Sequence, residues 1–264
     1  MGELRGIGKK SRLNLGKVLY QCRGIIRASE VARILNISIE KSFRLLRYWE
    51  KNGWIYRIKK GEYLPIPIES DSAQIAIEDP FKLATELFSP CYIGGWSAAE
   101  YWNLTEQIFQ TFIVFTEKHF SSKVQKISNT KFLLKMVKKN SLFGYESEWR
   151  EGLKVSISNP TKTIVDIFDD PLVGGGIRSV CDFYEEYLKS EYFSEDKLIN
   201  YTSKLGNRTV FKRMGFITEK VRPSLSNLIL YCQSRISKGY SQLDPSMKSK
   251  NIITKWKLRI PKGF

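Results

Sequence analysis

Residues 36–65 read NISIEKSFRLLRYWEKNGWIYRIKKGEYLP, and this stretch decides the fold of the first part of the chain. It opens with a polar turn, continues with apolar residues at helical spacing, and ends with two alternating runs around a glycine. Ser38 is placed to accept a hydrogen bond from the first turn of a helix, and Gly53 suits the left-handed position that follows one. The pattern therefore predicts a helix between Ser38 and Gly53, followed by a β-hairpin.

The predicted helix has two distinct faces, because side chains on a helix advance by about 100° per residue. Its apolar face contains Ile39, Ser42, Phe43, Leu46 and Trp49. Its opposite face contains Glu40, Lys41, Arg44, Arg47, Tyr48 and Lys51. A lone amphipathic helix is not stable in water, and helical spacing at 15–22 and 31–35 predicts two more helices that share a core with it.

Three short helices followed by a basic hairpin predict a winged helix-turn-helix in residues 1–68. In that arrangement one helix enters the major groove of DNA, and the hairpin reaches phosphates or the minor groove. The predicted DNA-binding residues are Ser38, Lys41, Arg44, Arg47, Tyr48 and Lys51 on the helix, with Arg57, Lys59 and Lys60 on the hairpin. Lys9, Lys10 and Arg12 are predicted to form a basic arm that adds phosphate contacts.

Positive charge is concentrated in the same region. Residues 1–68 contain 15 Lys and Arg against 5 Asp and Glu, a net charge of +10, whereas the other 196 residues contain 28 against 22, a net charge of +6. This concentration favours double-stranded DNA as the partner. An amphipathic helix with one basic side also occurs as a solvated face, so a protein-binding adaptor is the alternative function.

Residues 69–264 are predicted to form a larger α+β domain. Buried strands are predicted at 111–116, 131–138 and 153–158. Helical spacing then dominates, with helices predicted over 160–168, 177–189, 194–205, 207–215 and 224–237. Strands first and helices later indicate an α+β layout. Apolar alternation over 252–260 predicts a last strand that returns to the sheet.

The sequence also bounds the cellular setting. Its apolar runs are shorter than a membrane span, and the charged N-terminus is unlike a signal peptide, which predicts a cytoplasmic protein with no membrane partner. The four cysteines are far apart and form no CxxC pair, which favours free thiols over disulfides or zinc. We expect no cofactor.

Enzyme chemistry has few candidate residues in this sequence. His119 is the only histidine, and a lone histidine is more often structural than part of a triad or a metal cluster. A metal-dependent nuclease is the remaining enzymatic alternative, and it would use Asp166, Asp169 and Asp170 as a metal-binding carboxylate group. Asp166 lies within an apolar helical run, however, and Asp169-Asp170-Pro171 is typical of a helix end. We therefore expect no enzymatic activity.

Three sequence blocks follow the predicted hairpin in a fixed order: YIGGWSAAEYWNLTEQ at 92–107, NPTKTIVD at 159–166 and VFKRMGFITE at 210–219. Together with the predicted winged helix, these blocks resemble the AbiEi antitoxins of type IV toxin-antitoxin systems over about residues 15–220. Two features depart from the family pattern. Thr161 stands where an acidic residue is usual, and the basic tail after residue 238 has no counterpart.

The resemblance implies a transcriptional autorepressor that is also the antitoxin of an abortive infection system. Its implied partners are double-stranded operator DNA and a nucleotidyltransferase-like toxin, which the C-terminal antitoxin domain counteracts. On the matching blocks, the resemblance nominates an antitoxin face made of Trp96, Ser97, Tyr101, Lys212 and Arg213.

Overall fold

The computed structural model describes residues 7–22, 24–67, 77–247, 249–262 and 264, and has the predicted mixed α+β fold. It divides into two compact units: Met1–Glu78 with Lys126–Thr130, and Asp79–Gln125 with Lys131–Phe264. Residues 68–76, where the predicted domain boundary falls, lie outside the described residues. In the described ranges, no helix combines the length and apolar character needed to cross a bilayer.

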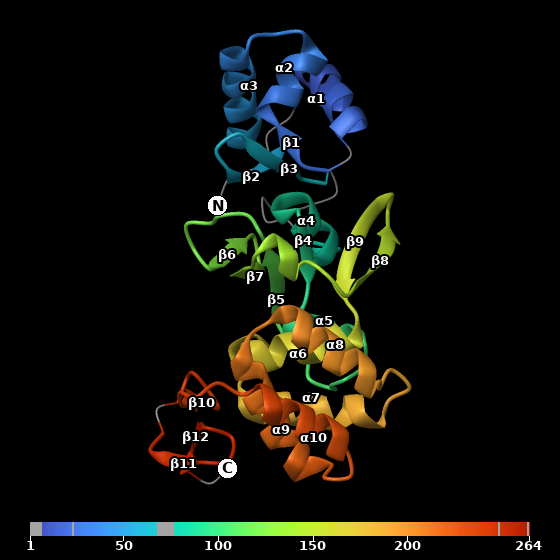
Figure 1. Ribbon diagram of the computed structural model, residues 1–264. Helices are drawn as coiled ribbons and strands as arrows, with labels where there is room; N and C mark the ends of the chain where they lie inside the picture. The colour runs from blue at the N-terminus through green and yellow to red at the C-terminus, as the bar shows by residue number, and fades with distance from the viewer. Residues whose placement is uncertain (1–6, 23, 68–76, 248, 263) are drawn as a thin grey trace. The chain divides into compact units, whose positions relative to one another are not determined.

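The first unit consists of three helices and a small antiparallel sheet (Figure 1). In chain order its elements are α1 (Lys9–Cys22), β1 (Ile26–Arg27), α2 (Ala28–Leu35), α3 (Ile39–Lys51), β2 (Ile55–Lys59) and β3 (Glu62–Pro65). The sheet has the order β1-β3-β2, so the predicted hairpin is confirmed and gains a third strand. Lys9, Lys10 and Arg12 belong to the first turn of α1, so the prediction of a separate basic arm is wrong, whereas phosphate contact by these residues stays a prediction.

The apolar faces of all three helices meet in one core. Leu15 and Val18 from α1, Val31 from α2, and Leu46 and Trp49 from α3 are buried together. The hairpin closes this core with Ile55 and Tyr63. Burial of this apolar surface stabilises helices that would be unstable alone.

A six-stranded mixed sheet in the order β6-β7-β5-β4-β9-β8 follows in the chain, and all of it belongs to the second unit except the residues of β6 and β7 that fall within 126–130. The elements in this part of the chain are α4 (Pro80–Phe88), β4 (Cys91–Ile93), α5 (Gly95–Tyr101), β5 (Thr111–Thr116), β6 (Val124–Ile127), β7 (Thr130–Met136), β8 (Tyr145–Arg150) and β9 (Leu153–Ser158). Parallel pairing joins β5 to β7 and β4 to β9, whereas β4–β5 and β8–β9 are antiparallel. The three predicted strands correspond to β5, β7 and β9, and the sequence analysis missed the shorter or more polar β4, β6 and β8.

Five helices follow the sheet and carry most of the core of the second unit. They are α6 (Pro160–Asp169), α7 (Ile177–Lys189), α8 (Glu195–Leu205), α9 (Arg208–Val221) and α10 (Ser226–Arg235). All five predicted helices are confirmed, and α9 extends further than its predicted end at residue 215. Two short 3₁₀ turns, Lys139–Ser141 and Pro171–Gly174, complete the chain order before α7.

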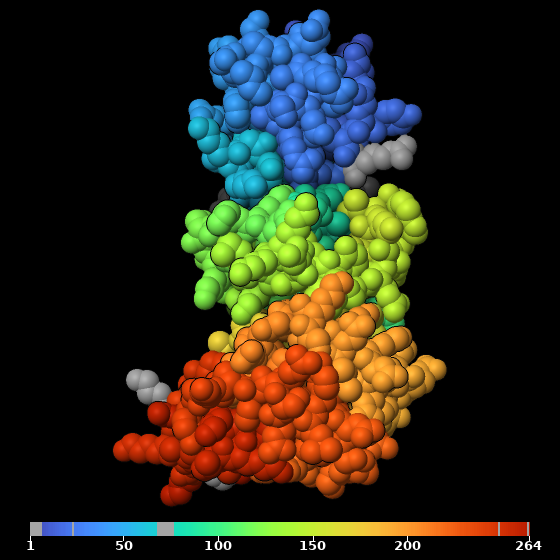
Figure 2. Space-filling view, in the orientation of Figure 1, coloured from blue at the N-terminus to red at the C-terminus, as the bar shows by residue number. Residues whose placement is uncertain are grey.

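The C-terminal segment forms a separate three-stranded sheet rather than returning to the large one. β10 (Ser241–Gln242), β11 (Asn251–Ile253) and β12 (Leu258–Ile260) have the order β10-β12-β11, so the predicted return is wrong. The segment packs on α9, where the ring of Trp256 occupies the space that a Cβ on Gly215 would need. In Figure 2 the red C-terminal segment and the orange helices share one continuous surface.

Candidate nucleic-acid interface

The position of α3 is fixed by local hydrogen bonds at both of its ends. Asn36 adopts a left-handed conformation with φ of 49°, which ends α2 and turns the chain. The Ser38 hydroxyl accepts a hydrogen bond from the Lys41 amide at 3.3 Å, so the predicted N-cap is confirmed. At the other end, Gly53 has φ of 75° and its amide donates to the Glu50 carbonyl at 3.0 Å.

The basic side of α3 faces solvent along its whole length. Lys41, Arg44, Arg47 and Lys51 are all exposed, while Ser42, Leu46 and Trp49 on the opposite side are buried. Within the described part of the chain, none of these four cations forms an ion pair with a carboxylate. Tyr48 lies on the same side, half-exposed, and its ring packs edge-on against Trp54 at a centroid distance of 5.5 Å.

The hairpin presents Arg57, Lys59 and Lys60 to solvent. A bulge between Arg57 and Lys59 shifts the register of β2 against β3. Glu62 lies next to this basic group: its carboxylate is 3.2 Å from the Lys59 Nζ and 3.8 Å from the Arg27 Nε. Lys59 is therefore partly neutralised, which the sequence analysis did not predict.

Glu40 is the acidic residue on the basic side of α3. A side-chain hydrogen bond with Ser38 lowers the pKa of Glu40, so this exposed carboxyl is ionised at neutral pH. Its place in the first turn of α3 is favourable for the helix dipole. At the same time it puts one negative charge beside the stripe of cations, which narrows the positive surface at the N-terminal end of α3.

The nominated antitoxin face is not a continuous surface, because three of its five residues are buried. Ser97 is only 3% exposed, and its hydroxyl accepts a hydrogen bond from the Ile113 amide at 3.0 Å. Ser97 lies inside α5, which begins at Gly95. Trp96 is half-buried, where its indole N–H donates to the Thr111 carbonyl at 2.6 Å and its ring stacks on Phe109.

Lys212 and Arg213 are buried under the C-terminal segment. The Lys212 ammonium donates to the Gly239 carbonyl and to the Ser241 hydroxyl, and burial lowers the pKa of Lys212. The Arg213 guanidinium donates to the carbonyls of Phe168, Asp169 and Gln242. Both side chains thus join α9 to neighbouring backbone, so the expectation that they form an accessible face is wrong.

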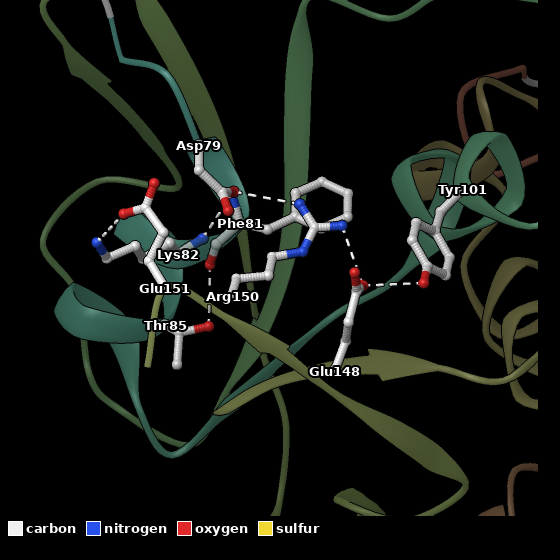
Figure 3. A network of polar contacts seen from close by, with 8 residues as sticks. All are labelled: Asp79, Phe81, Lys82, Thr85, Tyr101, Glu148, Arg150 and Glu151. Carbon is white, nitrogen blue, oxygen red and sulfur yellow. Dashed lines mark hydrogen bonds and ion pairs between the residues drawn. The ribbon is translucent and has the colours of Figure 1, made fainter. Parts of the chain in front are cut away.

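Tyr101 is the nominated residue that lies in a partly exposed polar network (Figure 3). Its hydroxyl donates to the Glu148 carboxylate at 2.9 Å, and Glu148 also accepts from Arg150 at 3.1 Å. The Arg150 guanidinium lies over the ring of Phe81 at 4.8 Å and donates to Asp79 at 3.3 Å. This network joins α4 and α5 to β8. No sequence pattern indicated this network, since the polar strand β8 was not predicted.

The aspartates of the nuclease alternative are engaged in the protein interior or at a helix end. Asp166 is 3% exposed and forms an ion pair with Lys162, which is fully buried. The Tyr92 hydroxyl donates to Asp166 at 2.9 Å and accepts from Lys162 at 2.9 Å. Burial raises the pKa of Asp166, an effect that Lys162 opposes. Asp169 accepts a hydrogen bond from Asn207 at 2.6 Å. These contacts leave Asp166 inaccessible to a substrate.

No family model matches the chain, and no curated protein matches it either.

Proposed function

We propose that the first unit is a winged helix-turn-helix and that the protein is a DNA-binding transcriptional repressor. The observation that carries this proposal is the row of exposed cations on α3, Lys41, Arg44, Arg47 and Lys51, on a helix whose other side is buried in a core. The element order α1-β1-α2-α3-β2-β3 supplies a basic hairpin next to that helix. α3 would enter the major groove, and Arg57 and Lys60 would contact phosphates.

A gel-shift series with the upstream region of the gene tests this proposal. If about six phosphates are neutralised, the logarithm of the binding constant falls against the logarithm of salt concentration with a slope of roughly −5. Absent or salt-insensitive binding contradicts the proposal. So does a pull-down in which the partner is an acidic protein retained after nuclease treatment, because that result identifies the adaptor alternative.

Variants on the two elements separate base recognition from phosphate contact. Arg44→Ala or Arg47→Ala should relax base discrimination by about 1–3 kcal/mol. Lys60→Ala should weaken binding to all DNA sequences alike and reduce the magnitude of the salt slope by about one. Lys197→Ala removes an exposed cation from α8 in the second unit and serves as the matched control, with unchanged affinity. Equal effects of Arg44→Ala and Lys197→Ala would contradict the assignment of α3 as the reading helix.

We further propose that this repressor is the autoregulating antitoxin of a type IV toxin-antitoxin system, acting in the cytoplasm against a nucleotidyltransferase-like toxin. The support is the resemblance of the three sequence blocks, all of which lie in the second unit. Two of these blocks have structural roles: 159–166 holds the buried Lys162 and 210–219 receives the C-terminal segment. The remaining candidates for the antitoxin function are the partly exposed Tyr101 and the exposed end of the first block at residues 106–107.

Co-expression with the neighbouring reading frame tests the antitoxin proposal separately from DNA binding. The double variant Arg44→Ala/Arg47→Ala, expressed from an unrelated promoter, should lose repression but still restore growth in the presence of the toxin. Loss of both activities would assign antitoxicity to the first unit. Failure of the wild-type protein to restore growth would contradict the antitoxin proposal and leave the repressor proposal standing.

A further inference from the structure

The first unit contains an apolar cleft of about 850 Å³ beside α1. One side of this α1 cleft is the face of α1 with Leu13, Gly16 and Tyr20, and the other side is formed by Trp54 and the end of β3 at Ile66. Its volume lies in the range of roughly 300–1,000 Å³ that is usual for small-molecule sites. All lining residues belong to the first unit.

Gly16 lies on the open side of the α1 cleft. A Cβ at this position would meet no atom within 4 Å, so the helix surface between Leu13 and Tyr20 is open. Those two flanking side chains are large, apolar and solvent-exposed, at 59% and 81%. Exposed apolar side chains around a hollow are characteristic of a site that becomes covered on binding.

Charge indicates what would cover the cleft. Arg12 and Lys17 are exposed cations that line it. Among the described residues, no Asp or Glu lines the cleft and neither cation forms an ion pair with a carboxylate. A second copy of the chain is disfavoured, because α1 (KKSRLNLGKVLYQC) carries four cations and no carboxylate and would face its own like charge. An occupant with one negative charge and a hydrocarbon body is complementary to both features.

We propose that the α1 cleft binds a free carboxylic acid with a hydrocarbon tail. The tail lies against Leu13, Tyr20 and Trp54 above Gly16, and the carboxylate contacts Arg12 or Lys17. This assignment makes α1 part of a ligand site, in addition to its role in the core through Leu15 and Val18.

The cleft is connected to the basic side of α3 by direct contacts. Gly53, which follows α3, lines it, and so does Trp54, whose ring packs on Tyr48. The Trp54 amide donates to the Trp49 carbonyl at 3.0 Å, and the Ile66 amide donates to the Trp54 carbonyl at 3.1 Å. A ligand against Trp54 therefore touches the junction between α3 and the hairpin. An effect of the ligand on DNA affinity rests on the proposed function, whereas ligand binding itself does not.

Isothermal titration calorimetry of the full-length protein with decanoate tests the proposal. We expect saturable binding with one site per chain, and binding of decyltrimethylammonium at least about tenfold weaker, since its head group has the opposite charge. The double variant Arg12→Gln/Lys17→Gln should bind decanoate about tenfold more weakly, or weaker still. Non-saturable binding, or equal binding of both amphiphiles, overturns the proposal.

Substitutions at Gly16 provide a matched pair. Gly16→Trp should abolish decanoate binding by filling the hollow, while Gly16→Ala should retain it. Space around Gly16 is open for a side chain, and replacing a glycine within a helix favours folding. Circular dichroism checks that each variant is folded. Equal binding by Gly16→Trp and wild type overturns the proposal. Sedimentation that shows a dimer dissociated by Gly16→Trp also overturns it, because a second copy would then cover the cleft.

Gel shifts with and without decanoate complete the test. A change in DNA affinity of the wild type, lost in Gly16→Trp, supports coupling between the cleft and α3. An unchanged DNA affinity with intact calorimetric binding removes the coupling and keeps the ligand site. If no gel shift is seen without ligand, the DNA-binding proposal fails. The calorimetric test of the ligand site does not depend on DNA binding.

Discussion

Lys162 is a charged residue that lies entirely inside the second unit. Its contacts are a carboxylate one helical turn later, at Asp166, and the hydroxyl of Tyr92 on β4. Its ammonium also lies 5.0 Å from the ring centre of Tyr92 and 4.8 Å from that of Phe143. The block NPTKTIVD therefore has a structural explanation in this chain: Asn159 caps α6, and Lys162 and Asp166 neutralise each other in the core.

Removing one member of this pair should be strongly destabilising. Lys162→Met leaves the Asp166 carboxylate buried without its cation, which should lower the free energy of unfolding by about 3–5 kcal/mol. The double variant Lys162→Met/Asp166→Leu should recover most of that loss, because no buried charge remains. Urea unfolding monitored by circular dichroism measures both. A double variant less stable than the single one would show that the pair contributes net stability.

At the scale of single elements, the hairpin is less positive than the sequence predicts. Glu62 on β3 pairs with Lys59 on β2 and lies close to Arg27 on β1, so all three strands contribute to one small cluster. Water screens the pair with Lys59, because the Lys59 side chain is 61% exposed, although that of Glu62 is only 20% exposed. The pair therefore affects the electrostatic field that a DNA phosphate backbone would meet at the hairpin more than it affects the stability of the hairpin.

Neutralising Glu62 should strengthen DNA binding if the hairpin contacts phosphates. Glu62→Gln removes one negative charge and releases Lys59, and we expect roughly two- to fivefold tighter binding at low salt, with the difference shrinking at high salt. Gel shifts at several salt concentrations measure it. Glu106→Gln, at an exposed position of the second unit, is the control for net charge. If both variants change affinity equally, the hairpin is not at the interface.

The C-terminal sheet is held to the helices by two carboxylates. Glu219 on α9 accepts from the Trp256 indole at 2.8 Å and from Lys255, and Asp244 accepts from the Ile177 amide at 2.9 Å and from Ser246. Burial by itself raises the pKa of each carboxyl, but the hydrogen bonds, from Lys255 and Trp256 for Glu219 and from Ser246 and Ile177 for Asp244, lower both pKa values overall.

The protein should therefore lose stability in acid through this segment. Both carboxyls have lower pKa values in the folded protein than in an unfolded chain, so they stabilise the fold above the ordinary carboxyl pKa, and this contribution disappears as the pH falls through their folded pKa values. We expect the free energy of unfolding, measured with urea, to fall between about pH 5 and pH 3. Glu219→Gln should show a smaller fall, whereas the exposed control Glu191→Gln should show the full one.

At the scale of the whole molecule, the described residues include a separate hydrophobic core in each unit. Leu46 is fully buried in the core of the first unit, and Leu198 is fully buried in that of the second. Each core is built from residues of its own unit. A domain with its own core is expected to unfold cooperatively by itself.

Calorimetry should therefore resolve two unfolding transitions with separate responses to mutation. Leu46→Ala should destabilise one transition by about 2–5 kcal/mol and leave the other unchanged, and Leu198→Ala should do the reverse. The two substitutions remove the same atoms from fully buried sites, so each serves as the control for the other. A single transition shifted by both variants would show that the two cores unfold as one cooperative unit.

The sequence by itself determined features that depend on neighbours a few residues apart. The period of apolar residues, Ser38 as N-cap and Gly53 after the helix predicted α3, and alternation around Gly61 predicted the hairpin. Such features follow from hydrogen bonds and side-chain periodicity within one or two helical turns. The exposed basic stripe follows directly, because the opposite side of the same helix had to be buried.

Only the tertiary structure decided which nominated residues are accessible. Ser97, Lys212 and Arg213 are buried by strands and segments far away in the sequence, and Tyr92 meets Lys162 across 70 residues. The small C-terminal sheet exists because Gly215 leaves room for Trp256, and the α1 cleft exists because residues 53–67 return beside Gly16. Burial is a sum over contacts between distant parts of the chain, and no local pattern encodes that sum.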